Sequence, residues 1–255
     1  MPDGGTVLRR AFFRNQIRRG QLVQLQPLQV EFVQDLPDIP VLPKTLLLLD
    51  LMVQEPCVDL RQMSQLLLAD LGATLQILRL AGREYGNTDD RPNRIEYCIS
   101  DLGLEACVQA VAAQTVARDC RQHAILEFWA HSREIAEHAR LVAEEVPRIN
   151  PEEAYLAGLL HAIGLLPALL GWKDSGAAND ALVGLRLATR WALPHYVTEF
   201  FREIHFTGYP VWWSGIVRKA HERANRSSSH CPFEEALRPF LLRDGYMQPE
   251  PAMVQ

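Results

Sequence analysis

The chain has 255 residues, of which 48% are apolar and 22% are charged, and these proportions are typical of a globular protein with its own core. Its formal net charge of -5 at pH 7 gives no basic excess, so the composition does not favour binding to nucleic acid or to an anionic membrane surface. The five cysteines include no C-x-x-C pair, which excludes the common zinc and redox motifs and indicates reduced core thiols in a cytoplasmic protein.

Residues 1–35 are predicted to form a basic N-terminal arm that includes a helix. The arm carries five arginines among apolar side chains, and Phe12, Phe13 and Ile17 can line one face of a helix. Two interpretations stay open, a solvated arm or a docking helix for a partner or an acidic surface. The first residues contain no apolar signal-peptide core, so a secretory signal is not expected.

Three closely spaced prolines mark the start of a compact domain. Pro37, Pro40 and Pro43 enforce an extended segment before the first helix of the domain. We predict that this domain covers residues 36–226. Residues 227–255 are predicted to follow it as a polar linker, a last amphipathic helix and a frayed tail.

Apolar residues recur at steps of three and four along the domain, and no segment alternates with a period of two. This periodicity predicts amphipathic helices and no strands. Asp59 and Asn150 are suited to cap the helices that begin after them. Helices are predicted over residues 44–53, 60–67, 71–85, 95–102, 104–118, 125–145, 151–170, 179–191, 194–203 and 211–225. The fold class is therefore predicted to be all-α, a single multi-helix bundle.

Residues 154–172 form an uncharged apolar run with His161 near its centre. The run is just long enough to span a bilayer, but its glycines, its histidine and Pro167 reduce its hydrophobicity and interrupt a continuous helix. A buried core helix is therefore the favoured interpretation over a membrane span. Next to His161 this helix offers Ala162, whose methyl group cannot bind a metal ion.

Six short motifs are spread along the domain. They are Leu36-Pro37-Asp38-Ile39-Pro40, the segment from Asp70 to Tyr85-Gly86, Leu102-Gly103, Phe128-Trp129-Ala130-His131-Ser132, Gly158-Leu159-Leu160-His161-Ala162-Ile163-Gly164, and Trp191-Ala192-Leu193-Pro194 leading towards His205. In order and spacing they resemble the HDOD family, the signalling output relatives of HD-type metal phosphohydrolases. The resemblance covers residues 36–225 and implies an HD-like helical bundle with a signalling role.

The chain departs from the family pattern where chemistry would be expected. Ala162 stands where the HD dyad has aspartate, and Asp180 and Ile204 stand where members often carry histidine. The resemblance therefore implies a degenerate motif. Its remaining positions in this chain are His131, His161, Ala162, Asp180 and His205.

An HD-type hydrolase needs neutral imidazoles and an anionic aspartate to hold a divalent ion and acidify its bound water. Since Ala162 offers no oxygen, we predict that the chain is not an enzyme, that it has no catalytic residues, and that it binds no metal or cofactor. Two alternatives stay open. His131, His161 and His205 could converge on a zinc ion, or Asp180 could replace the lost acid.

Trp212, Trp213, Arg218 and Arg223 are a candidate interaction surface, because they combine aromatic and basic side chains. A helix of period 3.6 cannot bury both tryptophans on one narrow stripe, so one is expected in the core and the other at a groove or partner. Ordinary packing of the pair is the alternative to ligand binding.

Taken with the resemblance, these observations predict a non-catalytic bacterial signalling module that binds a protein partner in the cytoplasm. The alternative is a residual metal-dependent phosphohydrolase or nucleotide-binding module of the HD type. Nucleic-acid binding through the arginine-rich arm ranks last because the chain is acidic. The sequence identifies neither the partner nor any small ligand, and it predicts no membrane association.

Overall fold

The computed structural model of the chain describes residues 39–55, 57–86, 88, 91–112, 122–172, 180–206 and 212–227. The chain divides into two compact units, Met1–Leu36 and Pro37–Gln255, and all of the described residues belong to the second unit. The predicted basic arm and the C-terminal segment beyond Ser227 lie outside the described residues.

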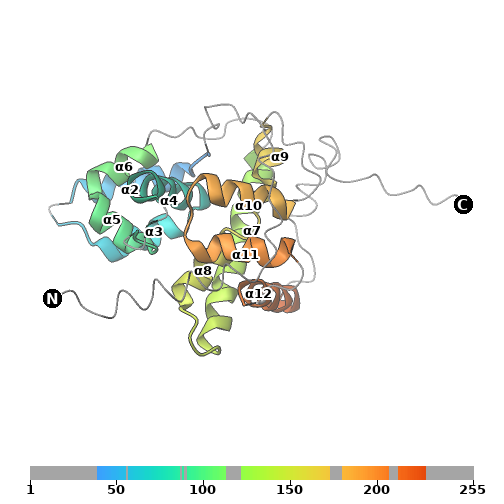
Figure 1. Cartoon of the computed structure of the whole chain (residues 1–255). Helices are drawn as coiled ribbons and strands as arrows, with labels where there is room; N and C mark the ends of the chain where they lie inside the picture. Colours follow the sequence, from blue (N-terminus) through green and yellow to red (C-terminus); the bar gives the residue numbers. More distant parts are fainter. Residues whose placement is uncertain are drawn as a thin grey trace, which may run out of the picture. The chain divides into compact units, whose positions relative to one another are not determined.

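The described residues of the second unit form helices and connecting segments, with no strand among them (Figure 1). This confirms the all-α prediction. The first group of helices, which pack on one another, is α2 (Pro43–Val53), α3 (Leu60–Leu68), α4 (Leu71–Tyr85), α5 (Ile95–Leu102) and α6 (Leu104–Ala112). The remaining helices are α7 (Gln122–Glu144), α8 (Pro151–Leu159), α9 (Leu166–Leu170), α10 (Asp180–Arg190), α11 (His195–His205) and α12 (Trp213–Ser227).

A fully buried carboxylate caps the start of α4. Asp70 is 0% exposed, and it caps α4 by accepting hydrogen bonds from the main-chain N–H groups of Gly72 and Ala73 at 2.9 and 3.3 Å. It also accepts from the N–H of Leu42 at 2.8 Å and from the indole Nε1–H of Trp129 at 2.9 Å. These four donors compensate the loss of hydration and join α4 to the segment before α2 and to α7.

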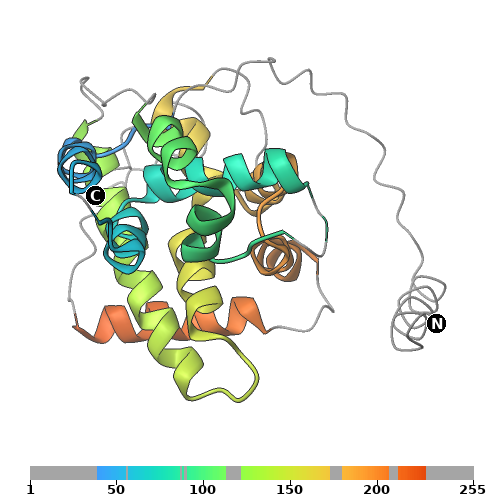
Figure 2. The same cartoon turned by 90° about the vertical axis from the view of Figure 1, so that its left-hand side faces the viewer.

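Helices α7 and α8 pack closely because of a glycine. A Cβ at Gly158 would lie only 2.8 Å from Cα of Ala136 and 2.9 Å from Cβ of Ala139, both on α7. Helix α12 contacts both α7 and α8, and Figure 2 shows it running across them. This arrangement brings α12 next to the uncharged run.

The helix predicted over residues 151–170 is interrupted in the structure, and the interruption comes before Pro167, the residue from which the sequence predicted one. Helix α8 ends at Leu159, His161 lies in the following turn, and a short 3-10 helix, η1 (Ile163–Leu165), leads into α9. Pro167 lies in the first turn of α9, where its missing N–H breaks no helical hydrogen bond.

A close approach of two backbones accompanies this break. A Cβ on Gly164 would lie 2.0 Å from the main-chain oxygen of Asp180, the first residue of α10. Only a glycine fits at such a distance. Helix η1, which directly follows the turn that carries His161, is therefore packed against the start of α10.

By length and composition alone, the segment Pro151–Leu170 could cross a membrane, and it is the one such segment among the described residues. However, 72% of its apolar window is buried inside the protein. It serves as core, which is consistent with a soluble protein.

The described cysteines are Cys57, Cys98 and Cys107. Cys98 and Cys107 are buried and free, and burial raises the pKa of their thiols to about 12 and about 11. Cys57 is exposed, so its prediction as a core thiol is wrong. Cys120 and Cys231 lie outside the described residues.

Candidate functional site

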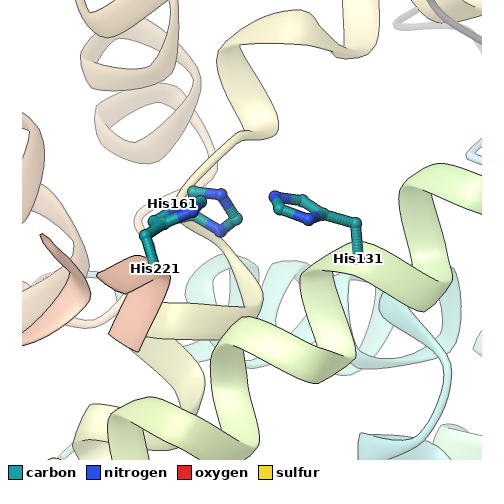
Figure 3. A group of neighbouring side chains, drawn as sticks. All are labelled: His131, His161 and His221. Carbon is teal, nitrogen blue, oxygen red and sulfur yellow. The ribbon is translucent and has the colours of Figure 1, made fainter. Parts of the chain in front are cut away.

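Three histidines from separate elements meet in the second unit. His131 comes from α7, His161 from the turn after α8, and His221 from α12, and Figure 3 shows that the three side chains point toward one another. One ring nitrogen of each lies within 4.8 Å of those of the other two. The ring centroids are 5.3 Å apart for His131 and His161, 5.3 Å for His131 and His221, and 4.8 Å for His161 and His221. We call these three residues the histidine cluster.

The ring of His161 is held in one orientation. Its Nδ1 lies 2.7 Å from the main-chain oxygen of Gly158. A carbonyl oxygen only accepts hydrogen bonds, so Nδ1 carries a proton, and in the neutral ring Nε2 keeps its lone pair. The same stretch of α8 that packs against α7 thus sets the tautomer of His161.

At neutral pH, His131 and His161 are uncharged. Burial, and secondarily the nearby His221, lowers the pKa of His131 to about 4. Burial lowers the pKa of His161 well below its ordinary value, and its two histidine neighbours lower it further. The neutral form is the one in which an imidazole binds a metal ion. As whole residues, all three histidines are half-buried.

The other positions of the degenerate motif do not join the cluster. Ala162 follows His161 in the turn and offers only a methyl group. Asp180 begins α10, but its carboxylate is not part of the cluster. His205 ends α11, and its ring packs edge-on against Phe206 with centroids 4.7 Å apart. Of the five predicted positions, the structure therefore brings together the imidazoles of His131 and His161 alone.

The third imidazole, that of His221, was not predicted from the sequence. It lies beside the buried stripe of α12 formed by Ile216, Val217, Ala220 and Ala224. A histidine next to an apolar stripe lies at the edge of the buried face of its helix, and this pattern is readable from sequence. That His221 would meet α7 and α8 depends on long-range packing, which helical periodicity does not reveal.

The start of α12 is fixed by Glu203, a buried residue of α11. Its carboxylate accepts hydrogen bonds from the main-chain N–H groups of Trp212, Trp213 and Ser214 at 3.0, 3.2 and 2.7 Å. A carboxylate at a helix N-terminus satisfies N–H groups that lack helical partners. Glu203 thus anchors the helix that carries His221.

The four residues of the predicted interaction surface have different surroundings. Trp212 is 57% exposed, and Arg218 is also exposed. Trp213 is half-buried and its ring lies 5.4 Å from that of Tyr196. Arg223 donates to Glu145 at 2.6 Å. Within this set, Trp212 and Arg218 are the side chains that face solvent.

A cleft of about 660 Å³ lies among residues of α3, α5, α7 and α8. It contains no member of the histidine cluster. Four arginines and three glutamates contribute to its lining, so opposite charges largely cancel: Arg61, Arg94, Arg133, Arg140, Glu96, Glu137 and Glu152.

Two crystal structures of one protein match the fold of this chain. The MmoQ response regulator from Methylococcus capsulatus str. Bath is 19% identical, with a TM-score of 0.59 over 82% of this chain and 98% of that chain. A second crystal structure of MmoQ, of fragment 20–298, is 20% identical and has the same TM-score of 0.59 over 85% of this chain and 95% of that chain. An HDOD domain protein of unknown function from Geobacter sulfurreducens is 21% identical, with a TM-score of 0.31 over 85% of this chain and 78% of that chain. No functionally curated protein matches the chain.

The family assignment rests on the sequence of the domain itself. Residues 39–177 match the HDOD domain, and this range is more than half of the chain. The range includes Asp70, His131 and His161, and the helical fold agrees with that of the MmoQ response regulator. The chain belongs to the HDOD domain family.

Proposed function

We propose that the chain is a non-catalytic signalling module that acts in the bacterial cytoplasm by binding a protein partner. Membership of the HDOD family and the likeness to a response regulator support a signalling role. The composition supports a soluble protein, and the most apolar segment is mostly buried.

The absence of a carboxylate from the histidine cluster is the observation that carries the non-catalytic proposal. Ala162 stands in place of the HD aspartate. Among the residues that the structure describes, neither Asp180 nor any other acid joins the three imidazoles. The site therefore lacks the anionic oxygen ligand that an HD-type hydrolase uses to hold its metal.

Exposed apolar side chains near the start of α12 support a protein partner. Trp212 is 57% exposed and Ile204 is 49% exposed. Ile204 directly follows Glu203, whose carboxylate binds the N–H of Trp212. Arg218, also exposed, lies on the helix that follows. Exposed tryptophan and arginine side chains are typical anchors of protein interfaces.

Substitution of Trp212 tests the partner-binding proposal. We expect Trp212→Ala to fold normally, because the main-chain N–H that Glu203 binds is retained. A protein that co-purifies with the wild-type chain from its native organism should be depleted by about tenfold or more, the effect of losing an interface anchor. Quantitative mass spectrometry measures the depletion.

The matched control is Leu126→Ala, which removes an apolar side chain that is 42% exposed on α7. This variant should retain the partner. Equal retention by Trp212→Ala, or equal depletion by both variants, contradicts a partner surface at Trp212.

A residual phosphohydrolase is the second candidate function. The observation in its favour is the meeting of His131 and His161 with a third imidazole, since three histidines and a water can form a catalytic zinc site. Turnover of phosphodiester or phosphomonoester substrates with added manganese or zinc would support this candidate over the first.

A further inference from the structure

The histidine cluster has the donor set of a metal site that differs from the HD type. Magnesium and manganese prefer carboxylate and other oxygen ligands, whereas imidazole suits zinc, copper and nickel. The cluster offers three nitrogens and, among the described residues, no carboxylate. It therefore does not fit the oxygen-rich metal centre of an HD hydrolase, but it fits one borderline transition-metal ion.

The positions of the three rings suit a single ion. Zinc binds imidazole nitrogen at about 2.0–2.1 Å, so ligand nitrogens in a tetrahedral site lie about 3.3 Å apart. The cluster nitrogens lie within 4.8 Å of one another. Rotation of the side chains about their Cα–Cβ and Cβ–Cγ bonds can supply the remaining contraction of about 1.5 Å, without movement of α7 or α12.

One ligand is already oriented as metal-bound histidines are. A histidine that binds a metal through one nitrogen usually donates its other N–H to a carbonyl or carboxylate, which fixes the tautomer. His161 meets this condition through Nδ1 and the carbonyl oxygen of Gly158 at 2.7 Å. Its Nε2 is thereby the atom available to an ion.

We propose that His131, His161 and His221 bind one zinc ion, with His221 as the third ligand and a fourth position left to water or an external ligand. The ion would connect α7, the turn after α8, and α12, three elements that are far apart in the sequence. The site would stabilise the packing of α12 rather than restore the HD centre, and it stands independently of the partner-binding proposal.

Calorimetric titration of the full chain, after treatment with a chelator, tests the site. We expect one zinc per chain for the wild type and no comparable binding of magnesium. His221→Gln should weaken zinc binding by more than about tenfold, the lower end of the loss caused by removing even an outer partner of a ligand. Zinc should also raise the thermal unfolding midpoint of the wild type and not that of His221→Gln.

The matched control is His205→Gln, because His205 is a partly exposed histidine of the degenerate motif outside the cluster. This variant should bind zinc as the wild type does. Cobalt provides a second readout: its visible spectrum should indicate tetrahedral coordination, without the near-ultraviolet band of a cobalt–thiolate bond. If His221→Gln does not fold by circular dichroism, His131→Gln replaces it in the titration.

Several results would overturn the proposal. These are no stoichiometric zinc binding by the wild type, equal binding by the wild type and the folded ligand variant, an equal loss in His205→Gln, or a cobalt–thiolate band. The first result identifies the cluster as three packed imidazoles that hold no metal ion. Each of the other three results means that any bound zinc is held by different residues.

Discussion

The carboxylate of Asp70 accepts four hydrogen bonds from three parts of the chain while it is shut away from solvent. A buried carboxylate stabilises a fold only while each of its donors remains hydrogen-bonded to it. A buried donor without an acceptor costs about 1–3 kcal/mol. Asp59 caps α3 through two of the same kind of main-chain bond, but it is exposed. Asp59 therefore serves as an exposed control for the buried helix cap Asp70.

We predict that Asp70→Asn lowers the free energy of unfolding by about 2–4 kcal/mol, since one oxygen becomes an N–H₂ group that faces the N–H of Leu42 and the charge-assisted bonds are lost. Asp59→Asn should change the free energy of unfolding by less than about 0.5 kcal/mol, because asparagine is an equally good helix cap. Urea unfolding monitored by circular dichroism measures both. Similar small losses in the two variants would contradict the role assigned to Asp70.

Single residues also decide which properties of the site were predictable. The missing acid at Ala162 is visible in the sequence and argues against HD chemistry without any structure. His205 matches the family pattern, yet it ends α11 beside Phe206 and outside the cluster. His221 matches no motif and supplies the third imidazole. The contribution of a residue to the site depends on packing between helices, which sequence motifs describe only indirectly.

At the scale of elements, the packing of α7 on α8 depends on Gly158. Its missing side chain lets Ala136 and Ala139 approach, and its carbonyl oxygen accepts the hydrogen bond of His161. One glycine thus determines both the distance between the helices and the orientation of a cluster histidine.

Gly158→Ala is expected to destabilise the protein by about 1–3 kcal/mol, because the backbone of α7 must move to accommodate the added methyl group. Gly215→Ala on α12 is the control, since a Cβ there meets nothing within 4 Å. It should be neutral or stabilising by up to about 1 kcal/mol, because alanine favours the helix. Thermal unfolding compares the two, and equal effects would contradict tight packing at Gly158.

Helices and their caps were largely predictable because they depend on local periodicity and on residues such as Asp59 and Asn150. The break after α8 was not predicted, because every residue from Leu159 through Leu166 except His161 is apolar or glycine. The break coincides with the contact of Gly164 on α10, a long-range feature. Pro167 indicated an interruption, but not its position.

For the whole molecule, the chain belongs to the HDOD domain family, and its fold matches that of the MmoQ response regulator. The described helices bring two motif histidines together, whereas no acid among the described residues joins them. The proposed consequences are separate in space. The proposed partner would bind at the exposed start of α12, and the proposed zinc ion would bind farther along the same helix at His221.

A turnover measurement tests whether the module is non-catalytic, as we propose. Purified wild type and His161→Ala are assayed side by side against phosphodiester and phosphomonoester substrates, with manganese or zinc added. We predict that the wild type shows no turnover above that of His161→Ala. Turnover by the wild type that His161→Ala abolishes would contradict the account.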